Sequence, residues 1–149
     1  VNFENGTGNK GVAANFLGMI EFCTDMESAA DVIDKGLIEL ARKKQALKLE
    51  FSPQGWEEIC RFHKTVVEIA TVSLSAAHLG DADLARQVIQ KKRALKTLER
   101  ELRESHLSRL NLGMRESINT SSIHLDLLGE YRHIASLMVN HAYNIQNAE

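Results

Sequence analysis

The stretch Met19–Arg42, MIEFCTDMESAADVIDKGLIELAR, decides the fold class of this chain. Its apolar residues recur every three or four positions, which is the period of one face of an α-helix. The expected apolar face consists of Met19, Phe22, Cys23, Met26, Ala30, Ile33, Leu37 and Leu40. We therefore expect a long amphipathic helix with this face turned toward a core.

Three carboxylates, Glu27, Asp31 and Asp34, project from one stripe of the same expected helix. One interpretation is a solvated face, because an amphipathic helix must place its polar groups somewhere. The other is a cation site, since oxygen ligands one turn apart can converge on a hard metal ion or cluster when another helix supplies the remaining ligands. Both interpretations stay open at this point.

Length and composition favour a single helical domain. A chain of 149 residues is long enough for one core and too short for two ordinary domains. One proline, 44% apolar residues and 5% aromatic residues are typical of a helical bundle. The net charge of −2 argues against nucleic acid and anionic membrane surfaces as partners.

Other classes of sequence signal are missing. No apolar run reaches the roughly 18 to 20 residues that span a bilayer, and no signal peptide is evident, so we expect a soluble chain. Cys23 and Cys60 sit within apolar helical patterns, where a free thiol behaves as a small hydrophobe. Two such thiols favour a reducing compartment over a disulfide framework.

Turn signals divide the chain into a lead-in and four helices. The Gly- and Asn-rich residues 1–10 predict a flexible lead-in. Ser52 and Pro53 predict a helix start, and Gly80 followed by Asp81 predicts one helix end and the next cap. The expected helices run from about Val12 to Leu47, from Pro53 to Gly80, from Ala82 to about Leu110 and from about Met114 to Ile145. Because the connections are short, the expected fold is all-α, an antiparallel up-down four-helix bundle.

The later helices also show apolar faces. The second expected face contains Trp56, Ile59, Cys60, His63, Val66, Val67, Ala70, Leu74 and Ala77; the third, Leu84, Val88, Leu95, Leu98 and Leu102; the fourth, Leu125, Leu128, Ala135, Val139 and Ala142. A histidine on such a face is more often a hydrogen-bonded core residue than a ligand, so we expect His63 in the core. Glu99 with Arg103, and Arg100 with Glu104, predict ion pairs on a solvated face.

The motifs of common enzymes are incomplete. A di-iron bundle needs a Glu-x-x-His pair on two helices, and Glu130 with His133 supplies one such pair without a second. Ser, His and Asp are scattered without a nucleophile elbow or a glycine-rich phosphate loop. A bundle could still bring together some of His106, His124, His133 and His141. We therefore expect no enzyme.

Four stretches resemble one known family. They are ESAADVIDKGLIELARKK (residues 27–44), FSPQGWEEICRFHK (51–64), DADLARQVI (81–89) and LRESHLSRLNLGMRESINTSSIHLDLLGEYRHIASL (102–137). In this order they resemble the PhoU-like cytoplasmic domain at the C-terminal end of bacterial sodium/phosphate cotransporters. A chain that contains both FSPQGW and TSSIHLDLL resembles the members of that family that belong to transporters.

The resemblance implies a possible metal cofactor, either a divalent ion or an iron cluster. Family members carry a Glu/Asp-x-x-x-Asp motif on one helix of each repeat, and some bind iron or zinc clusters through it. Glu27 to Asp31 matches the first motif. The second falls on residues 132–136, where both carboxylates are missing, although a shifted register offers Asp126 and Glu130. Together with Asp34, which lies on the same expected stripe, the metal-ligand candidates are Glu27, Asp31 and Asp34.

The resemblance also implies domain organisation and function. Residues 11–149 would be a PhoU-like helical domain that holds the last helix of a first repeat and one complete second repeat. The implied function is a non-catalytic regulatory or structural domain on the cytoplasmic face of the bacterial inner membrane. Its partners would be the transmembrane domain of the same polypeptide and a second copy, in a homo-oligomer such as a dimer. The alternative is a free-standing metal-binding regulator of phosphate uptake.

Overall fold

The computed structural model describes residues 6–147, with side chains from Gly11 onward, and every regular element in that part of the chain is a helix. The elements are α1 (Gly6–Asp31), the π-helical stretch η1 (Val32–Leu37), α2 (Ile38–Ala46), α3 (Pro53–Leu79), α4 (Ala82–Asn111), α5 (Arg115–Asn119) and α6 (Ser121–Asn147). The predicted all-α fold is confirmed. The elements α1, η1 and α2 run on without a break, and we call them together the first helix.

The first helix begins earlier than its sequence indicated. We expected a lead-in over residues 1–10, but residues 6–10 already belong to α1, and residues 1–5 lie outside the described part of the chain. Each glycine costs a helix only about 1 kcal/mol relative to alanine, so a stable helix can propagate through Gly6 and Gly8.

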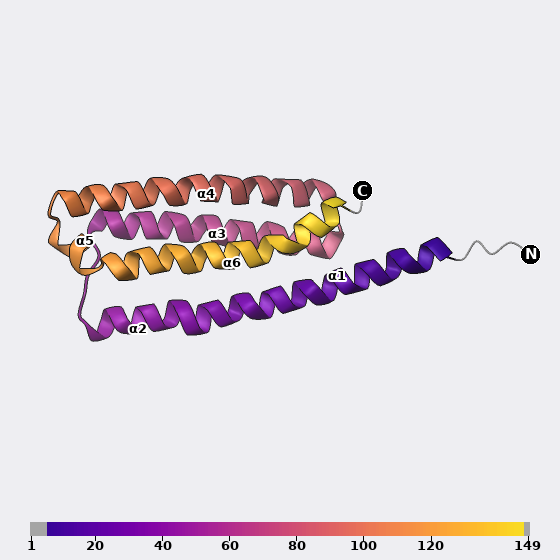
Figure 1. Cartoon of the computed structure of the whole chain (residues 1–149), viewed down its shortest axis with the longest axis horizontal. Coiled ribbons are helices and arrows are strands. Elements are labelled where there is room, and N and C mark those ends of the chain that lie inside the picture. Colours follow the sequence, from indigo (N-terminus) through magenta and orange to yellow (C-terminus); the bar gives the residue numbers. More distant parts are fainter. Residues whose placement is uncertain (1–5, 148–149) are drawn as a thin grey trace, which may run out of the picture.

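Three of the four long helices form a mutual bundle, and the fourth lies outside it. The helices α3, α4 and α6 all contact one another, whereas the first helix packs along α6 (Figure 1). Its N-terminal end extends past the ends of the other helices. The predicted antiparallel sequence of four long helices is therefore present, with α6 as the helix that all the others contact. No helix within residues 6–147 is long and apolar enough to cross a membrane.

The helix boundaries with strong local signals fall where the sequence predicted them. The Ser52 hydroxyl accepts a hydrogen bond from the Gly55 N–H at 3.1 Å, and Pro53 occupies the first position of α3. Gly80 ends α3 in the left-handed conformation at φ 62°. The Asp81 carboxylate accepts from the Leu84 N–H at 2.9 Å and so begins α4. Caps of these types satisfy backbone groups that a helix end leaves free.

The last expected helix is interrupted at one residue. We expected a single helix from about Met114, but α5 ends at Asn119 and α6 begins at Ser121. Thr120 lies between them with φ −100° and ψ 3°, and its hydroxyl donates to the Glu116 carbonyl at 2.7 Å. Such bonds between a side chain and the backbone compete with regular helix geometry. The break lets the short α5 turn in toward the end of the bundle.

The core fills the space between α3, α4 and α6. Its fully buried large side chains include Phe62, Ile69, Val88, Leu95, Leu128 and Val139. The expected seam of the third helix is mostly confirmed, since Val88, Leu95, Leu98 and Leu102 are buried. Of the expected face of the fourth helix, Leu128, Ala135, Val139 and Ala142 are buried, and Leu125 is half-buried.

The first helix buries a face different from the one we expected. Of the expected arc only Phe22 is buried, whereas Met19, Met26 and Ile33 are exposed. From Gly11 onward, the buried residues of the helix are Gly18, Phe22 and Ala29. They are small or lie beside small residues, so α6 can approach closely.

Two glycines show how close that approach is. A Cβ atom on Gly18 would lie 3.3 Å from Cε1 of His141, and one on Gly36 would lie 2.9 Å from Cδ of Glu130. Both contacting side chains belong to α6. The first helix is therefore seated on α6 by its small residues, and most of its larger apolar residues point elsewhere.

Only part of the expected apolar face of α3 is buried. Ile59, Val66 and Ala77 are buried as expected, but Trp56, Cys60, His63, Val67 and Leu74 are exposed. The placement of His63 in the core was wrong, because α4 and α6 cover only the half of the face that includes Phe62 and Ile69. The other half points out of the bundle beside the first helix.

Replacing Phe62 tests the position of the core. Phe62 is completely buried, so we expect Phe62→Ala to lower the free energy of unfolding by roughly 3–5 kcal/mol through lost contacts and a cavity. The control Leu107→Ala, at an exposed position of α4, should change it by no more than about 0.5 kcal/mol. Urea denaturation followed by circular dichroism measures both. Equal effects of the two changes would contradict this core.

Candidate functional site

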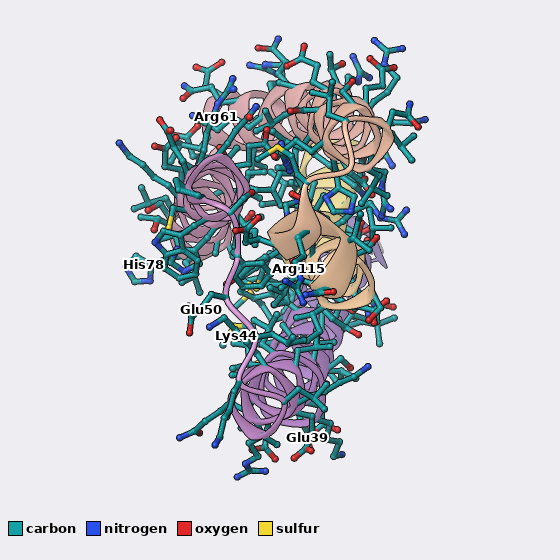
Figure 2. All side chains as sticks on the ribbon, turned by 90° about the vertical axis from the view of Figure 1, so that its left-hand side faces the viewer. Glu39, Lys44, Glu50, Arg61, His78 and Arg115 are labelled. Carbon is teal, nitrogen blue, oxygen red and sulfur yellow. The ribbon has the colours of Figure 1, made fainter. Side chains whose placement is uncertain are left out.

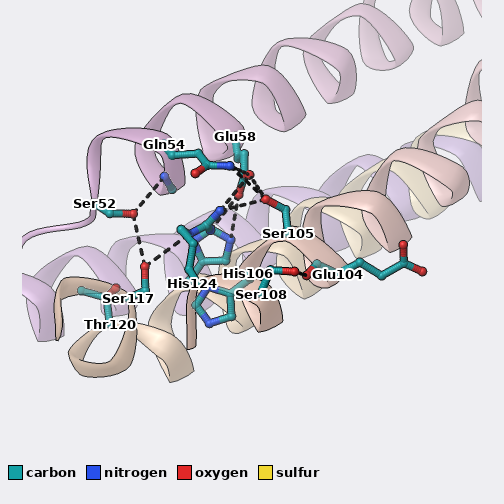
Figure 3. Close-up of polar contacts among 12 residues, drawn as sticks. Ser52, Gln54, Glu58, Glu104, Ser105, His106, Ser108, Ser117, Thr120 and His124 are labelled. Carbon is teal, nitrogen blue, oxygen red and sulfur yellow. Dashed lines mark hydrogen bonds and ion pairs between the residues drawn. The ribbon is translucent and has the colours of Figure 1, made fainter. Parts of the chain in front are cut away.

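A buried polar cluster lies at the end of the bundle where α3 begins and α4 ends (Figure 3). Its members are Ser52, Glu58, Ser105, His106, Arg109, Ser117 and His124, and we call them the polar cluster. They come from the start of α3, the end of α4, α5 and the start of α6. So many polar groups in a bundle interior require an account of their partners.

An ion pair forms the centre of the polar cluster. The Arg109 guanidinium donates to both carboxylate oxygens of Glu58, at 2.9 and 2.8 Å, and the two side chains are only 3% and 11% exposed. Burial opposes ionisation of Glu58, but the hydrogen bonds from Arg109 and Ser105 hold the pKa of its carboxyl below its ordinary value. A bidentate pair of this kind fixes geometry as well as charge.

Serine hydroxyls connect the Glu58–Arg109 ion pair to other helices by hydrogen bonds. Ser105 donates to Glu58 at 2.6 Å, and Arg109 Nε donates to Ser117 of α5 at 3.2 Å. Ser117 in turn donates to the Ser52 hydroxyl at 3.3 Å, the same oxygen that caps α3. The network therefore ties the start of α3 to the ends of α4 and α5.

Two histidines stack inside the same cluster. The rings of His106 and His124 lie 4.5 Å apart and nearly parallel, and both residues are buried. His106 Nε2 bonds to Ser121 at 2.9 Å, while His106 Nδ1 and His124 Nε2 have no hydrogen-bond partner. Burial, followed by the neighbouring His106 and Arg109, lowers the pKa of His124 to about 4. The stacked pair is therefore neutral near pH 7.

The polar cluster has the character of a structural clamp. Its carboxylate is occupied by Arg109 and Ser105. Its histidines lie inside the bundle, 1% exposed. The sequence indicated that histidines of the third and fourth helices could meet, and the structure brings together His106 and His124.

The predicted metal ligands lie on the surface. Glu27, Asp31 and Asp34 are exposed, and Asp31 accepts a hydrogen bond from Lys35 at 2.7 Å. Among the described residues there is no group of three or more His, Cys, Asp or Glu that could hold a metal ion. The carboxylate stripe thus fits no metal cluster with the residues described, and metal binding through it stays a prediction.

The two residues of the partial di-iron motif, Glu130 and His133, form no metal site with other described residues. Glu130 is half-buried, and its carboxyl group packs over Gly36 of η1. His133, its partner in the motif, is exposed. The shifted register of Asp126 and Glu130 likewise gathers no further ligand among the residues described.

A hollow between the first helix, α3 and α6 is a second candidate site. It has a volume of about 760 Å³. Its lining is mainly apolar and includes Leu37, Leu40, Trp56, Cys60, Leu127 and Tyr131. His63 also lines it, with its ring 5.4 Å from that of Tyr131. We call this hollow the groove.

The rim of the groove is charged where the linker crosses from α2 to α3. Lys44 pairs with Glu50 at 3.1 Å (Figure 2). Its Nζ lies 5.6 Å from the centre of the Phe51 ring. Phe51 stacks on Trp56, which is 56% exposed. An apolar floor with a charged rim is the usual form of a site that receives a helix or another apolar surface.

Both cysteines are free and exposed. Cys60 lines the groove, and Cys23 lies on the first helix. Neither is buried as a core hydrophobe, so the expectation drawn from their apolar surroundings was wrong about burial. The apolar patterns that hold them belong to the outward faces of the first helix and α3.

Comparisons with known proteins identify relatives. The family model described as "PhoU domain" matches residues 59–145. A protein of Salmonella typhimurium named "Putative inorganic phosphate export protein YjbB" is 31% identical over 127 residues, which cover 85% of this chain and 23% of the relative. The protein of the same name from Escherichia coli strain K12 is 30% identical over the same length. The chain thus spans about a quarter of the length of these relatives. No solved structure matches it.

Acid should destabilise the protein through His124. The pKa of this buried ring falls from 6.5 to about 4 on folding, so between those pH values the unfolded chain binds the proton and the folded chain does not. Stability is therefore complete above pH 6.5 and decreases by about 3 kcal/mol as the pH falls to about 4. Urea denaturation at a series of pH values measures the loss. The variant His124→Phe should lose clearly less over this window, and an identical loss would contradict the assignment.

The buried ion pair should be sensitive to removal of one partner. We expect Arg109→Met to cost roughly 3–5 kcal/mol of unfolding free energy, because Glu58 is left charged and buried. The matched control Lys35→Met breaks the exposed Lys35–Asp31 pair and should leave the free energy of unfolding nearly unchanged. Similar losses for both variants, measured by urea denaturation at pH 7, would argue against the clamp.

Proposed function

Because the chain belongs to the PhoU domain family, we propose that it is a regulatory or structural domain of a sodium-dependent phosphate transporter. It acts by docking a helical surface against its partner and makes or breaks no bonds itself. The partner is the transmembrane domain of the same polypeptide, and the domain works at the cytoplasmic face of the membrane. The relatives named as phosphate export proteins support the link to phosphate transport.

The groove is the observation that supports docking. Leu40, Trp56 and Tyr131 come from three different helices and offer one apolar recess that the described residues leave open. Exposed apolar recesses of this size mark interaction sites in soluble domains. A helix of the transporter that enters the groove would couple its own position to the angle between the first helix and α3.

The chemistry of the polar groups supports a role without catalysis. The ionised pair of the polar cluster is used within the fold, and the histidines with free nitrogen atoms are buried. The groove is lined mainly by aliphatic and aromatic side chains, and its polar lining residues include Lys44, Glu50, Cys60 and His63. No observation favours the alternative of a free-standing metal-binding regulator over the transporter domain.

Phosphate flux through the full-length gene product tests this function. We expect Leu40→Glu and Trp56→Glu to change the uptake or release of radiolabelled phosphate several-fold in cells that lack other phosphate transporters, because a charge in the groove prevents docking. The control Leu107→Glu, at an exposed position of α4, should leave the flux unchanged.

The test requires that the variants reach the membrane at the level of the unmodified protein. Immunoblotting of membrane fractions provides that measurement. Normal flux in both groove variants would contradict a docking role. A full-length gene product without membrane-spanning segments would contradict the transporter assignment itself.

A further inference from the structure

The middle of α4 carries a run of basic residues that no acidic residue interrupts. Between Leu84 and Leu98 the helix contains no Asp or Glu, and its Lys and Arg residues are Arg86, Lys91, Lys92, Arg93 and Lys96. The last part of α6, residues 133–147, contains no Asp, Glu, Lys or Arg. These two stretches lie side by side, because α4 and α6 pack antiparallel. The surface that they share therefore carries an excess of positive charge.

Contacts between α4 and α6 join the basic side chains into one surface. Lys92 Nζ lies 5.5 Å from the centre of the Tyr143 ring on α6. Arg103 of α4 and Arg132 of α6 approach the same carboxylate, that of Glu99, at 2.9 and 3.5 Å. Glu99 is only 9% exposed, so one buried carboxylate stands against two guanidinium groups. We call the following six residues the basic face: Lys92, Arg93, Lys96, Arg100, Arg103 and Arg132.

Much of this charge is available to a partner. Arg93 and Lys96 are exposed and form no ion pair with the residues that the structure describes. Arg100 lies 4.0 Å from Glu104, but the two side chains are 72% and 69% exposed, so water screens the pair. The positive charge of these three residues is therefore largely uncompensated.

Other carboxylates near the basic face lie at one of its ends. Asp126 and Glu130 of α6 line a hollow together with Arg103 and Arg132. They are close to the end of the face that the polar cluster adjoins, and no acidic residue of α6 follows Glu130 within the described residues. The excess of positive charge is therefore concentrated nearer to Lys92.

Many acidic residues lie on the opposite side of the molecule. The exposed Glu27, Asp31 and Asp34 belong to the first helix, which lies across the bundle from α4 (Figure 1, Figure 2). Glu21 and Asp25 of the same helix line a hollow between it and α6. The axes of packed helices are about 8–10 Å apart, so two successive packings place the first helix roughly 16–20 Å from α4. The Debye length at physiological ionic strength is about 8 Å, so a partner at the basic face is little affected by these carboxylates.

We propose that the basic face binds the anionic headgroups of a lipid bilayer. The net charge of −2 is a sum over the whole chain, and a flat surface meets only one side of the molecule. The basic residues of α4 follow one side of a long helix, so a plane can contact them together when that helix lies parallel to it. The choice of a membrane over other polyanions rests on the proposed function, which places the domain beside one.

The same distribution of charge defines an orientation on the membrane. Each Lys or Arg close to an anionic membrane surface raises the affinity about fivefold, so Arg93, Lys96 and Arg100 together contribute roughly 100-fold. The carboxylates of the first helix are repelled by the same surface. The domain therefore lies with α4 toward the bilayer and the first helix away from it.

Sedimentation with lipid vesicles tests the proposal on this chain alone. The chain should bind vesicles of equal parts phosphatidylglycerol and phosphatidylcholine at about 0.1 M salt, and binding should disappear at about 1 M salt. It should not bind vesicles of phosphatidylcholine alone. The triple variant Arg93→Gln, Lys96→Gln, Arg100→Gln should bind the anionic vesicles roughly 100-fold more weakly.

A matched control separates the basic face from the net charge. The triple variant Arg61→Gln, Lys64→Gln, Arg115→Gln removes three exposed cations outside the basic face and has the same net charge. It should bind within about threefold of the unmodified chain, because single surface contacts are weak. Circular dichroism should show the same helix content in both variants. No binding by the unmodified chain, or equal losses in the two variants, would overturn the proposal.

Tryptophan fluorescence tests which side meets the membrane. Trp56 is the single tryptophan of the chain and lines the groove, outside the basic face. Its emission should keep its wavelength when anionic vesicles are added, whereas a shift to shorter wavelength would place the groove in the bilayer and overturn the proposal. Binding of a DNA duplex without binding of vesicles would also overturn it. Because these tests need no transporter, their failure leaves the phosphate-flux test of the proposed function unaffected.

Discussion

A helix with one main packing neighbour can bury only one of its faces, and this constraint governs the present structure. The helices α3, α4 and α6 contact one another, whereas the first helix makes most of its contacts outside its own length with α6. Burial of apolar surface is the main favourable contribution to folding, at about 25 cal/mol per Å². The first helix buries apolar surface where Gly18 and Ala29 allow α6 to approach, and most of its larger apolar residues remain exposed. A recess between this helix and α3 follows directly.

Features that depend on neighbouring residues could be predicted from the sequence. The starts and ends of α3 and α4 follow from Ser52, Pro53, Gly80 and Asp81, whose effects act within a single turn. The family resemblance was also confirmed, since the PhoU domain model matches most of α3 and all of α4 and α5. The choice between buried and exposed apolar faces could not be predicted. Both Phe22 and Met26 suit a core, and the number of packed neighbours decides which of them is buried.

The polar cluster was missed for the same physical reason. Glu58 and Arg109 are 51 positions apart, and no local spacing connects them. Their pairing depends on the antiparallel packing of α3 on α4 and on the break at Thr120, which turns Ser117 inward. The three carboxylates Glu27, Asp31 and Asp34 show the opposite case. Their spacing on one side of a helix could be predicted from the sequence, but a metal site needs ligands from a second element, which the described residues do not bring to them.

The structure thus combines a closed bundle, fixed at one end by a buried ion pair, with a long helix that is buried on one side and exposed on the other. Maleimide labelling of cysteines on these two sides tests this account most directly. The native Cys23 is exposed and should react at nearly the rate of an unfolded peptide, whereas a cysteine introduced by Phe22→Cys, in a background of Cys23→Ser and Cys60→Ser, should react much more slowly because Phe22 is buried. Equal rates at the two positions would contradict the packing of the first helix.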